Sequence, residues 1–102
     1  MRRVMVRYKV KPEHVAANEE LVRGVYEELA RVRPDGFRYG TFKLEDGVSF
    51  VHIAAQEGER NPLADVAAFQ RFQENIRDRC DEPPAVTRLD EVGSFRFEGE
   101  IS

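Results

Sequence analysis

His52 carries the side chain best suited to acid–base chemistry in this 102-residue chain. It alternates with Phe50 and Ala54, and the two-residue period of a strand turns such side chains toward one face. A neutral imidazole, with an unperturbed pKa of about 6.5, is the usual general base of enzymes. We expect His52 either to act on a substrate, as base or orienting donor, or to be a hydrogen-bonded histidine of the core or of a dimer interface.

Asn18 is the second candidate, because its amide occupies a core-facing position of a predicted helix. The side chains on this helical face step by three and four residues, and they are Val15, Asn18, Val22, Val25, Leu29 and Val32. A buried amide needs hydrogen-bond partners or costs about 1–3 kcal/mol. We expect Asn18 either to orient a substrate oxygen in a cavity between helix and sheet or to reach solvent in the first turns of the helix.

Tyr8 and Tyr39 are the candidate walls of the same pocket, one on the first predicted strand and one on the second. Aromatic walls with a few hydroxyl groups suit a flat, apolar or aromatic ligand. Buried tyrosines serve equally well as residues of a core or an interface. Both readings of the two tyrosines therefore stay open.

Other common catalytic sites have no counterpart in the sequence. The chain has two histidines and one cysteine, and they do not show the spacing of metal ligands. It contains no Gly-rich phosphate loop and no G-x-S-x-G nucleophile elbow. We therefore expect neither a metal nor a cofactor.

Six predicted elements must position these candidates. Alternating patterns and turn signals predict strands at residues 4–10, 37–44, 48–56 and 86–97. Helical stripes predict helices at residues 15–32 and 63–76, the second beginning after Asn61-Pro62 and ending at residues 81–84. The order β-α-β-β-α-β is the ferredoxin-like plan of the α+β class, in which two helices cover one face of an antiparallel sheet.

Both faces of the predicted sheet carry large apolar side chains. In the second strand, Phe37 and Tyr39 lie on one face, and Phe42 and Leu44 lie on the other. The uncovered face of such a sheet is polar in a monomer, whereas an uncovered apolar face marks an interaction surface. We therefore expect a homodimer whose subunits stack their sheets face to face.

RNA-binding domains with an RNP1 strand share this element order, and the stretch DGVSFVHI at residues 46–53 occupies the position of that strand. Gly47, Phe50 and Val51 agree with it, but Asp46 replaces a basic residue and Val48 replaces a stacking aromatic. The net charge of −3 also opposes binding to a phosphate backbone. We expect no nucleic-acid partner.

The length and patterning predict a single domain over residues 1–102. No stretch approaches the roughly 18 apolar residues of a membrane helix, and the first ten residues lack the apolar region of a signal peptide. A lone cysteine cannot form an intrachain disulfide, which suits a reducing compartment. We expect a cytoplasmic protein without a membrane partner.

Three stretches resemble the antibiotic-biosynthesis-monooxygenase-like family. FVHIA at residues 50–54, followed by a short acidic loop and AAFQRF at residues 67–72, is similar to that family's third strand and second helix. VMVRYKVKP at residues 4–12 is similar to its first strand and the approach to its first helix. The resemblance covers nearly the whole chain and implies a ferredoxin-like subunit in a dimeric α/β barrel.

The resemblance also implies a range of functions. The family includes cofactor-independent monooxygenases of quinols and polycyclic aromatics, haem-degrading enzymes and members of unknown role. Members often carry a histidine on the second helix, where this chain has Phe72, and the haem-degrading members use a tryptophan, which this chain lacks. The implied function is a cofactor-independent monooxygenase of a small aromatic or quinol-like substrate, with His52 and Asn18 as catalytic residues. The alternative is a non-catalytic barrel that binds a small molecule or is purely structural.

Overall fold

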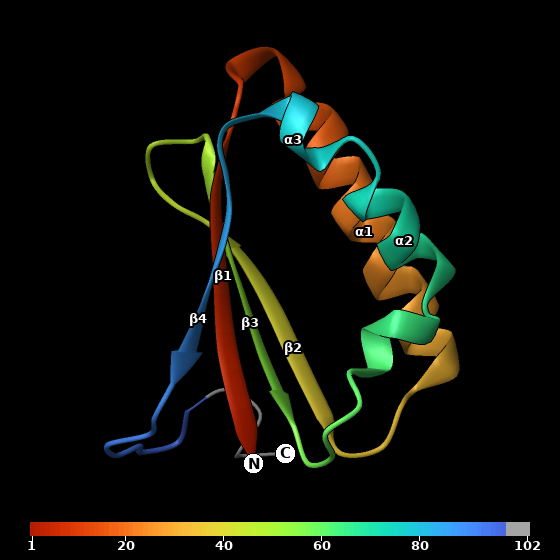
Figure 1. Cartoon of the computed structure of the whole chain (residues 1–102), viewed down its shortest axis with the longest axis vertical. Coiled ribbons are helices and arrows are strands. Elements are labelled where there is room, and N and C mark those ends of the chain that lie inside the picture. The colour runs from red at the N-terminus through yellow and green to blue at the C-terminus, as the bar shows by residue number, and fades with distance from the viewer. Residues whose placement is uncertain (98–102) are drawn as a thin grey trace.

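Four antiparallel strands form a single sheet, and the helices lie against one of its faces (Figure 1). The structure is a computed structural model that describes residues 1–97. The strands are β1 (Arg2–Val10), β2 (Phe37–Lys43), β3 (Ser49–Gln56) and β4 (Cys80–Leu89), and their order in the sheet is β2-β3-β1-β4. The α-helices are α1 (Val15–Val32), α2 (Ala67–Gln73) and α3 (Ile76–Arg79), and two 3-10 helices are η1 (Pro12–His14) and η2 (Pro62–Asp65).

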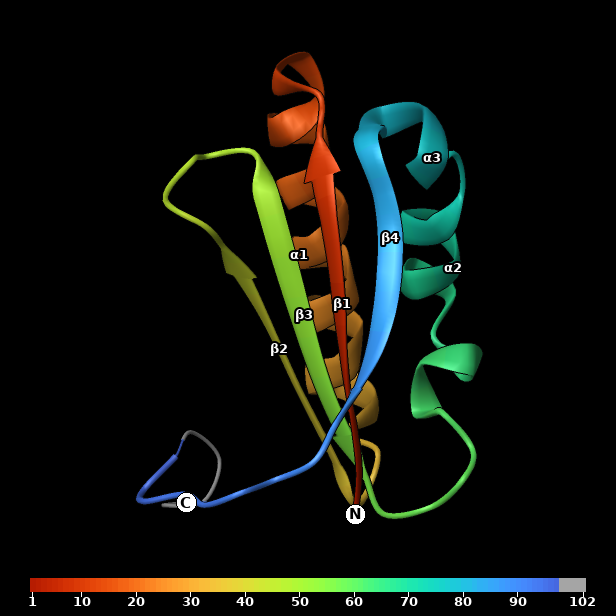
Figure 2. The same ribbon diagram turned by 60° about the vertical axis from the view of Figure 1, so that its left-hand side comes forward.

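The helices share one side of the sheet, as the turned view shows. In Figure 2, α1 runs behind the central strands β1 and β3, with α2 and α3 beside it. This arrangement confirms the predicted ferredoxin-like fold of the α+β class. Among residues 1–97, no helix lies on the opposite face of the sheet.

Helix α1 has the predicted bounds and carries Asn18 and Val25 as its buried residues. It ends at Arg33, whose backbone is left-handed (φ 49°) and whose N–H donates to the Leu29 carbonyl at 2.8 Å. Val32 was expected on the buried stripe, but it is 55% exposed in the last turn of the helix. No helix among the described residues is long and apolar enough to cross a membrane.

The second predicted helix, at residues 63–76, is divided into η2, α2 and α3. Asn61 begins the first piece as predicted, because its side chain accepts a hydrogen bond from the Leu63 N–H at 3.0 Å. The extended backbone of Val66 and the left-handed backbone of Asn75 (φ 59°) then interrupt the helical hydrogen bonds. The prediction of one continuous helix is therefore wrong, although most of its apolar stripe still faces the core.

The prediction of the last strand, at residues 86–97, is wrong at both ends, because β4 starts and finishes earlier. Pro83 and Pro84 were expected to separate helix from strand, but they lie inside β4. The register with β1 shifts there, so that the two prolines oppose Tyr8 alone. Because β4 is an edge strand and the shift is a bulge, the sheet tolerates the missing N–H groups.

One core lies between the sheet and the helices. Its buried side chains come from three strands and from the helical layer, and they are Tyr8, Val10, Val25, Phe50, Leu63, Val66, Ala68, Phe72 and Cys80. This core positions the inner faces of β1, β2 and β3 directly under α1. Residues 98–102, which the single-domain prediction includes, lie outside the described residues.

Candidate functional site

His52 lies at the centre of a hydrogen-bonded cluster on the helix-covered face of the sheet. The register places Thr41 directly opposite His52, and β1 brings the Tyr8 side chain beside it. The Nε2 atom of His52 lies 2.8 Å from the Tyr8 hydroxyl, and its Nδ1 atom lies 2.6 Å from the Tyr39 hydroxyl and 3.1 Å from the Thr41 hydroxyl. Both ring nitrogens therefore have partners, although the residue is only 4% exposed.

The cluster continues into α1 and α3 through the amide of Asn18. Asn18 Nδ2 donates to the Tyr8 hydroxyl at 2.9 Å, and Arg79 Nη2 donates to Asn18 Oδ1 at 3.4 Å. The Asn18 side chain is completely buried. These bonds supply the partners that a core-facing amide requires.

Burial keeps the histidine and tyrosines of the cluster uncharged at neutral pH. Desolvation lowers the pKa of His52 from 6.5 to about 4. Desolvation also raises the pKa of Tyr8 and Tyr39 far above the ordinary value of 10.0. The imidazole is therefore neutral and both phenols are protonated, so these groups interact as hydrogen-bond donors and acceptors.

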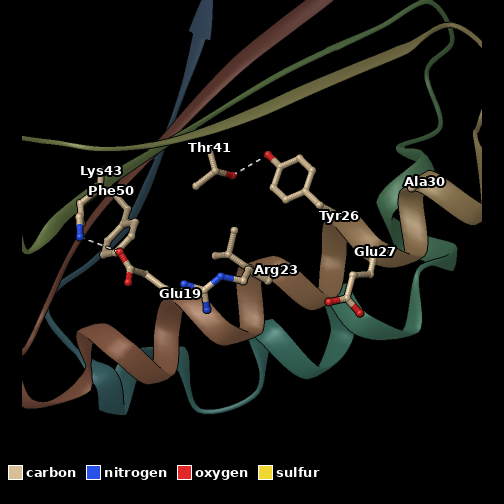
Figure 3. Close-up of a pocket in the computed structure, with 9 residues that line it drawn as sticks. Glu19, Arg23, Tyr26, Glu27, Ala30, Thr41, Lys43 and Phe50 are labelled. Carbon is tan, nitrogen blue, oxygen red and sulfur yellow. Dashed lines mark hydrogen bonds and ion pairs between the residues drawn. The ribbon is translucent and has the colours of Figure 1, made fainter.

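A groove with a volume of about 660 Å³ lies beside this cluster, between α1 and strands β2 and β3 (Figure 3). Its walls include Val22, Tyr26, Ala30, Thr41 and Phe50. The Tyr26 hydroxyl lies 2.7 Å from Thr41 Oγ1, which is also bonded to His52. Thr41 and Tyr26 therefore connect the buried cluster to the groove.

Charged side chains lie around the same groove, and the labelled ones are Glu19, Arg23, Glu27 and Lys43 (Figure 3). The Lys43 ammonium lies 2.7 Å from the Glu19 carboxylate, and the Arg23 guanidinium lies 2.8 Å from the Glu20 carboxylate. The groove thus combines aromatic and aliphatic walls with a charged rim that contains two ion pairs.

A second cavity, of about 580 Å³, lies on the opposite face of the sheet. Its lining includes Phe42, Ile53, Ala55, Leu89 and Phe97. The segment after β4 borders this cavity, and an ion pair of 3.3 Å between Arg3 and Glu91 holds that segment near β1. This face leaves apolar side chains exposed, since Phe42 is 44% and Phe97 58% accessible to solvent.

The described residues offer few alternatives to the cluster and the groove. Among residues 1–97, His, Cys, Asp and Glu side chains nowhere form a group of three that could hold a metal ion. Cys80 is buried, and desolvation raises the pKa of its thiol, which disfavours the reactive thiolate.

No family model matches the sequence, and no curated protein is similar enough in sequence to be matched. Solved structures are similar to it in fold. A protein from Nitrosomonas europaea, provisionally described as an antibiotic biosynthesis monooxygenase, superposes with a TM-score of 0.74 at 19% identity, over 91% of this chain and 100% of its own. Rv0793 from Mycobacterium tuberculosis gives 0.70 at 18% identity, over 91% and 96%. A variant of SnoaB, a cofactor-independent oxygenase from Streptomyces nogalater, gives 0.67 at 19% identity, over 91% and 94%.

The chain has the fold of these proteins. The resemblance noted in the sequence is thereby confirmed for the fold. Phe72, at the position where that resemblance expects a helix histidine, packs its ring 5.3 Å from the ring of His52. The imidazole of this chain thus comes from β3 but lies beside that helix position.

The four predicted site residues lie in one cluster. His52 contacts both Tyr8 and Tyr39, and Asn18 contacts Tyr8. The alternative in which Asn18 reaches solvent is wrong, because its amide is completely buried. Asn18, Tyr8 and His52 line neither of the two cavities, and Tyr39 lines the second one. The cluster therefore lies behind the wall of the groove.

Three residues of the site were missed in the sequence. Thr41 is two positions from Tyr39 in an alternating strand, so its place on the same face could have been inferred. Tyr26 follows the apolar stripe of α1 by one position, and its contact with β2 depends on how the helix packs. Arg79 lies in a charged run that reads as a solvated helix face, although only 8% of it is exposed.

Proposed function

We propose that this protein oxidises a small aromatic hydroxyl compound with molecular oxygen, without a cofactor, in the groove between α1 and the sheet. The observation that carries the proposal is the hydrogen-bonded path from His52 through Thr41 to Tyr26, which reaches the groove. The similarity in fold to SnoaB, a cofactor-independent oxygenase, supports it. Fold similarity alone does not establish an activity, so the proposal depends on the chemistry of the groove.

The groove suits a flat ligand with few polar groups. Its volume of about 660 Å³ lies within the range of about 300–1,000 Å³ that is typical of small-molecule sites. Tyr26 and Phe50 offer aromatic surface, and Val22 and Ala30 offer aliphatic surface. The hydroxyl groups of Tyr26 and Thr41 supply the few polar contacts that orient a ligand in such a site.

In this proposal the hydroxyl groups stabilise the ionised form of the substrate. Donors that are already in place around a developing oxyanion favour it at little reorganisation cost. An ionised aromatic ring is rich in electrons and can reduce oxygen itself. The phenolic O–H bond breaks on ionisation, and oxygen adds to a ring carbon that carries one C–H bond. That C–H bond and the O–O bond then break, so that one oxygen atom stays as a carbonyl and the other leaves as water, which takes up the C–H proton and the phenolic proton. The substrate supplies all four electrons.

The buried residues have supporting roles in this scheme. His52 is the orienting donor of the cluster, because it bonds to Thr41 and Tyr39 next to the groove. Asn18 is the polar anchor behind it, through Tyr8. Tyr8 and Tyr39 form the walls around the imidazole and hold its orientation.

A second candidate function is binding without catalysis. The observation that favours it is the complete enclosure of Asn18 and the near-complete burial of Tyr8 and His52, none of which lines the groove. In that case the cluster is a buried polar network that specifies the packing of α1 on the sheet.

Oxygen uptake separates the two candidates. Purified protein is incubated with a panel of anthrols, naphthols and quinols, and oxygen consumption is compared with the rate without protein. Tyr26→Phe and Thr41→Val each remove one hydroxyl group, and we expect each to lower kcat at least tenfold, since losing one oxyanion donor costs about 10²–10³ in rate. His14→Gln changes the other histidine of the chain and serves as the control with an unchanged rate. If no compound raised oxygen uptake above the uncatalysed rate, the oxygenase proposal would be contradicted and binding without catalysis would replace it.

We also propose that the working unit is a homodimer with the bare faces of its two sheets in contact. The cavity on that face, its exposed Phe42 and the exposed apolar side chains after β4 support this arrangement. Among residues 90–97, Val92 is 101% and Phe95 83% exposed, which is costly in a monomer. A second copy of the chain, bringing the same apolar surface, would cover these side chains in a symmetric contact.

A further inference from the structure

Arg79 is a buried cation whose place is set by neutral groups. Its Nη2 atom donates to the Phe72 carbonyl at 2.6 Å, and its Nη1 atom donates to the Glu74 carbonyl at 2.9 Å. The guanidinium also lies 5.5 Å from the centre of the Phe72 ring. Among residues 1–97, no carboxylate forms an ion pair with it. The carbonyl end of α2 therefore holds the charge in place, where the helix dipole favours a cation.

Arg79 determines which way the Asn18 amide points. The Nη2 atom of Arg79 lies 3.4 Å from one side-chain atom of Asn18. A guanidinium only donates hydrogen bonds, so the amide atom that faces it is the oxygen. The amide nitrogen then faces Tyr8, at 2.9 Å from its hydroxyl.

The orientation of Asn18 in turn decides how Tyr8 binds His52. The Tyr8 oxygen accepts a hydrogen from Asn18, so the hydroxyl hydrogen remains to be donated. The Nε2 atom of His52, at 2.8 Å, is the other partner of this hydroxyl. If Nε2 carried the proton, the Tyr8 hydrogen would be buried without an acceptor, which costs about 1–3 kcal/mol. Nε2 therefore accepts, and Nδ1 carries the imidazole proton.

We infer that Arg79, acting through Asn18 and Tyr8, fixes His52 in the tautomer protonated on Nδ1, so that the groove receives a hydrogen-bond donor and takes a ligand with an acceptor oxygen. Arg79 and Asn18 are positioning residues in this inference, since neither lines the groove. The tautomer is a property of the free protein. The ligand class rests on the groove being the site of the proposed function.

The direction of the hydrogen bonds can be followed outward from His52. Nδ1–H donates to the Tyr39 hydroxyl at 2.6 Å. Thr41 Oγ1 lies 3.1 Å from the same Nδ1 atom and 2.7 Å from the Tyr26 hydroxyl. Because a protonated Nδ1 cannot accept a hydrogen bond, Thr41 gives its hydrogen to Tyr26, and the hydrogen of Tyr26 is left for the groove. The acceptor that fits this end is a phenolate or a quinone-type carbonyl.

The same direction limits what His52 can do. A proton that arrived from the groove would reach Nδ1, which already carries one. The lone pair of the unprotonated ring nitrogen is on Nε2, where it accepts the hydrogen of Tyr8 on the far side of the ring. His52 is therefore an orienting donor toward the groove and not the base that accepts the substrate proton.

The tautomer can be measured without any ligand. Long-range ¹H–¹⁵N correlation spectra of ¹⁵N-labelled protein at pH 7 distinguish a protonated from an unprotonated ring nitrogen, and we expect His52 to be protonated on Nδ1 alone. Asn18→Asp is a nearly isosteric change that makes Tyr8 donate to the carboxylate, so that Nε2 becomes the protonated atom. Arg79→Gln frees the amide to turn, so both tautomers are expected. His14 gives the internal control in every spectrum.

Two results would overturn the tautomer assignment. The first is a wild-type His52 protonated on Nε2, which is decisive even if no variant folds. The second is an unchanged His52 tautomer in folded Asn18→Asp and Arg79→Gln proteins, since a merely structural network would give that result.

The ligand class is tested with para-nitrophenol, whose absorbance reports its own ionisation. At saturating protein, we expect the pKa of the bound probe to fall by about one unit, a tenfold change in its ionisation constant. Tyr26→Phe should abolish this shift, while Lys43→Met should keep most of it. A probe that does not bind, a raised pKa, or a shift lost only in Lys43→Met would overturn the acceptor-ligand assignment. A lowered pKa without oxygen uptake by any compound would overturn the proposed oxygenase and leave this inference standing.

Discussion

His52 links the chemistry of a single side chain to the stability of the whole fold. Its folded-state pKa is about 4, while the unfolded chain titrates near the ordinary value of about 6.5. Between these values the unfolded state binds more protons, so stability falls as the pH falls from about 6.5 to about 4. The difference corresponds to about 3 kcal/mol of unfolding free energy, which is fully present above pH 6.5.

Urea unfolding between pH 7.5 and 5 measures this effect. We expect the wild-type unfolding free energy to fall as the pH is lowered over this range, because His52 becomes protonated in the unfolded state. The fall should amount to at most about 3 kcal/mol. His52→Gln lowers stability at pH 7 because it alters the cluster, but it should lose most of this slope. His14→Gln is the matched control and should keep the slope. An equal slope in all three proteins would mean that His52 titrates with an ordinary pKa in the folded state.

At this scale the sequence was informative where a polar residue interrupts an apolar pattern. Asn18 and His52 were found because each replaces an apolar side chain on a buried face. Arg79 could not be found in this way, since its burial depends on the carbonyl groups at the end of α2. Tyr26 and Thr41 depend on the packing of α1 against β2, which a single sequence does not contain.

At the scale of elements, one carboxylate joins the two main helices. Glu28 of α1 accepts hydrogen bonds from the N–H groups of Ala68 and Ala67, at 2.8 and 3.3 Å, at the start of α2. These bonds lower the pKa of Glu28 below its ordinary value. The stabilisation is therefore present at neutral pH and is lost as the carboxylate protonates at acid pH. Glu28 supplies from another helix the cap that α2 lacks in its own sequence.

Glu28→Ala tests this capping contact. We expect the melting temperature at pH 7 to fall by about 5 °C, the usual effect of losing one helix cap in a domain of this size. Amide hydrogen exchange at Ala68 should become faster in the same variant. Glu27→Ala removes the neighbouring glutamate, which makes no such bond, and serves as the control. Equal melting temperatures for the two variants would contradict the capping role.

The order of elements was predictable, but the bounds around α3 and β4 were not. Pro83 and Pro84 read as a break between helix and strand, since proline lacks an N–H group. The bulge opposite Tyr8 and the edge position of β4 remove the need for that N–H. The predicted second helix is interrupted at Val66 and Asn75, whose backbones are not helical. The apolar stripe continues through these positions and does not reveal the interruptions.

At the scale of the whole molecule, the two faces of the sheet have different surroundings. The inner face carries the core and the His52 cluster beneath α1. The outer face carries a cavity bordered by Phe42, Ile53 and the segment after β4. The sequence predicted an uncovered apolar face, because large apolar residues of β2 and β3 occupy alternating positions that point to both faces of the sheet. It could not predict the cavity, which depends on where residues 90–97 run.

The proposed homodimer uses that outer face and can be tested in solution. We expect sedimentation equilibrium to give twice the chain mass of 11.8 kDa at micromolar concentration. Phe42→Ser should raise the dimer dissociation constant at least tenfold, because burying one such ring contributes about 1.5–3 kcal/mol and the symmetric contact contains it twice. Val32→Ser removes an apolar side chain that is also exposed, at the end of α1, and should leave the constant unchanged. A wild-type protein that sediments as a monomer would contradict the face-to-face dimer, and the exposed apolar side chains would then need a different partner.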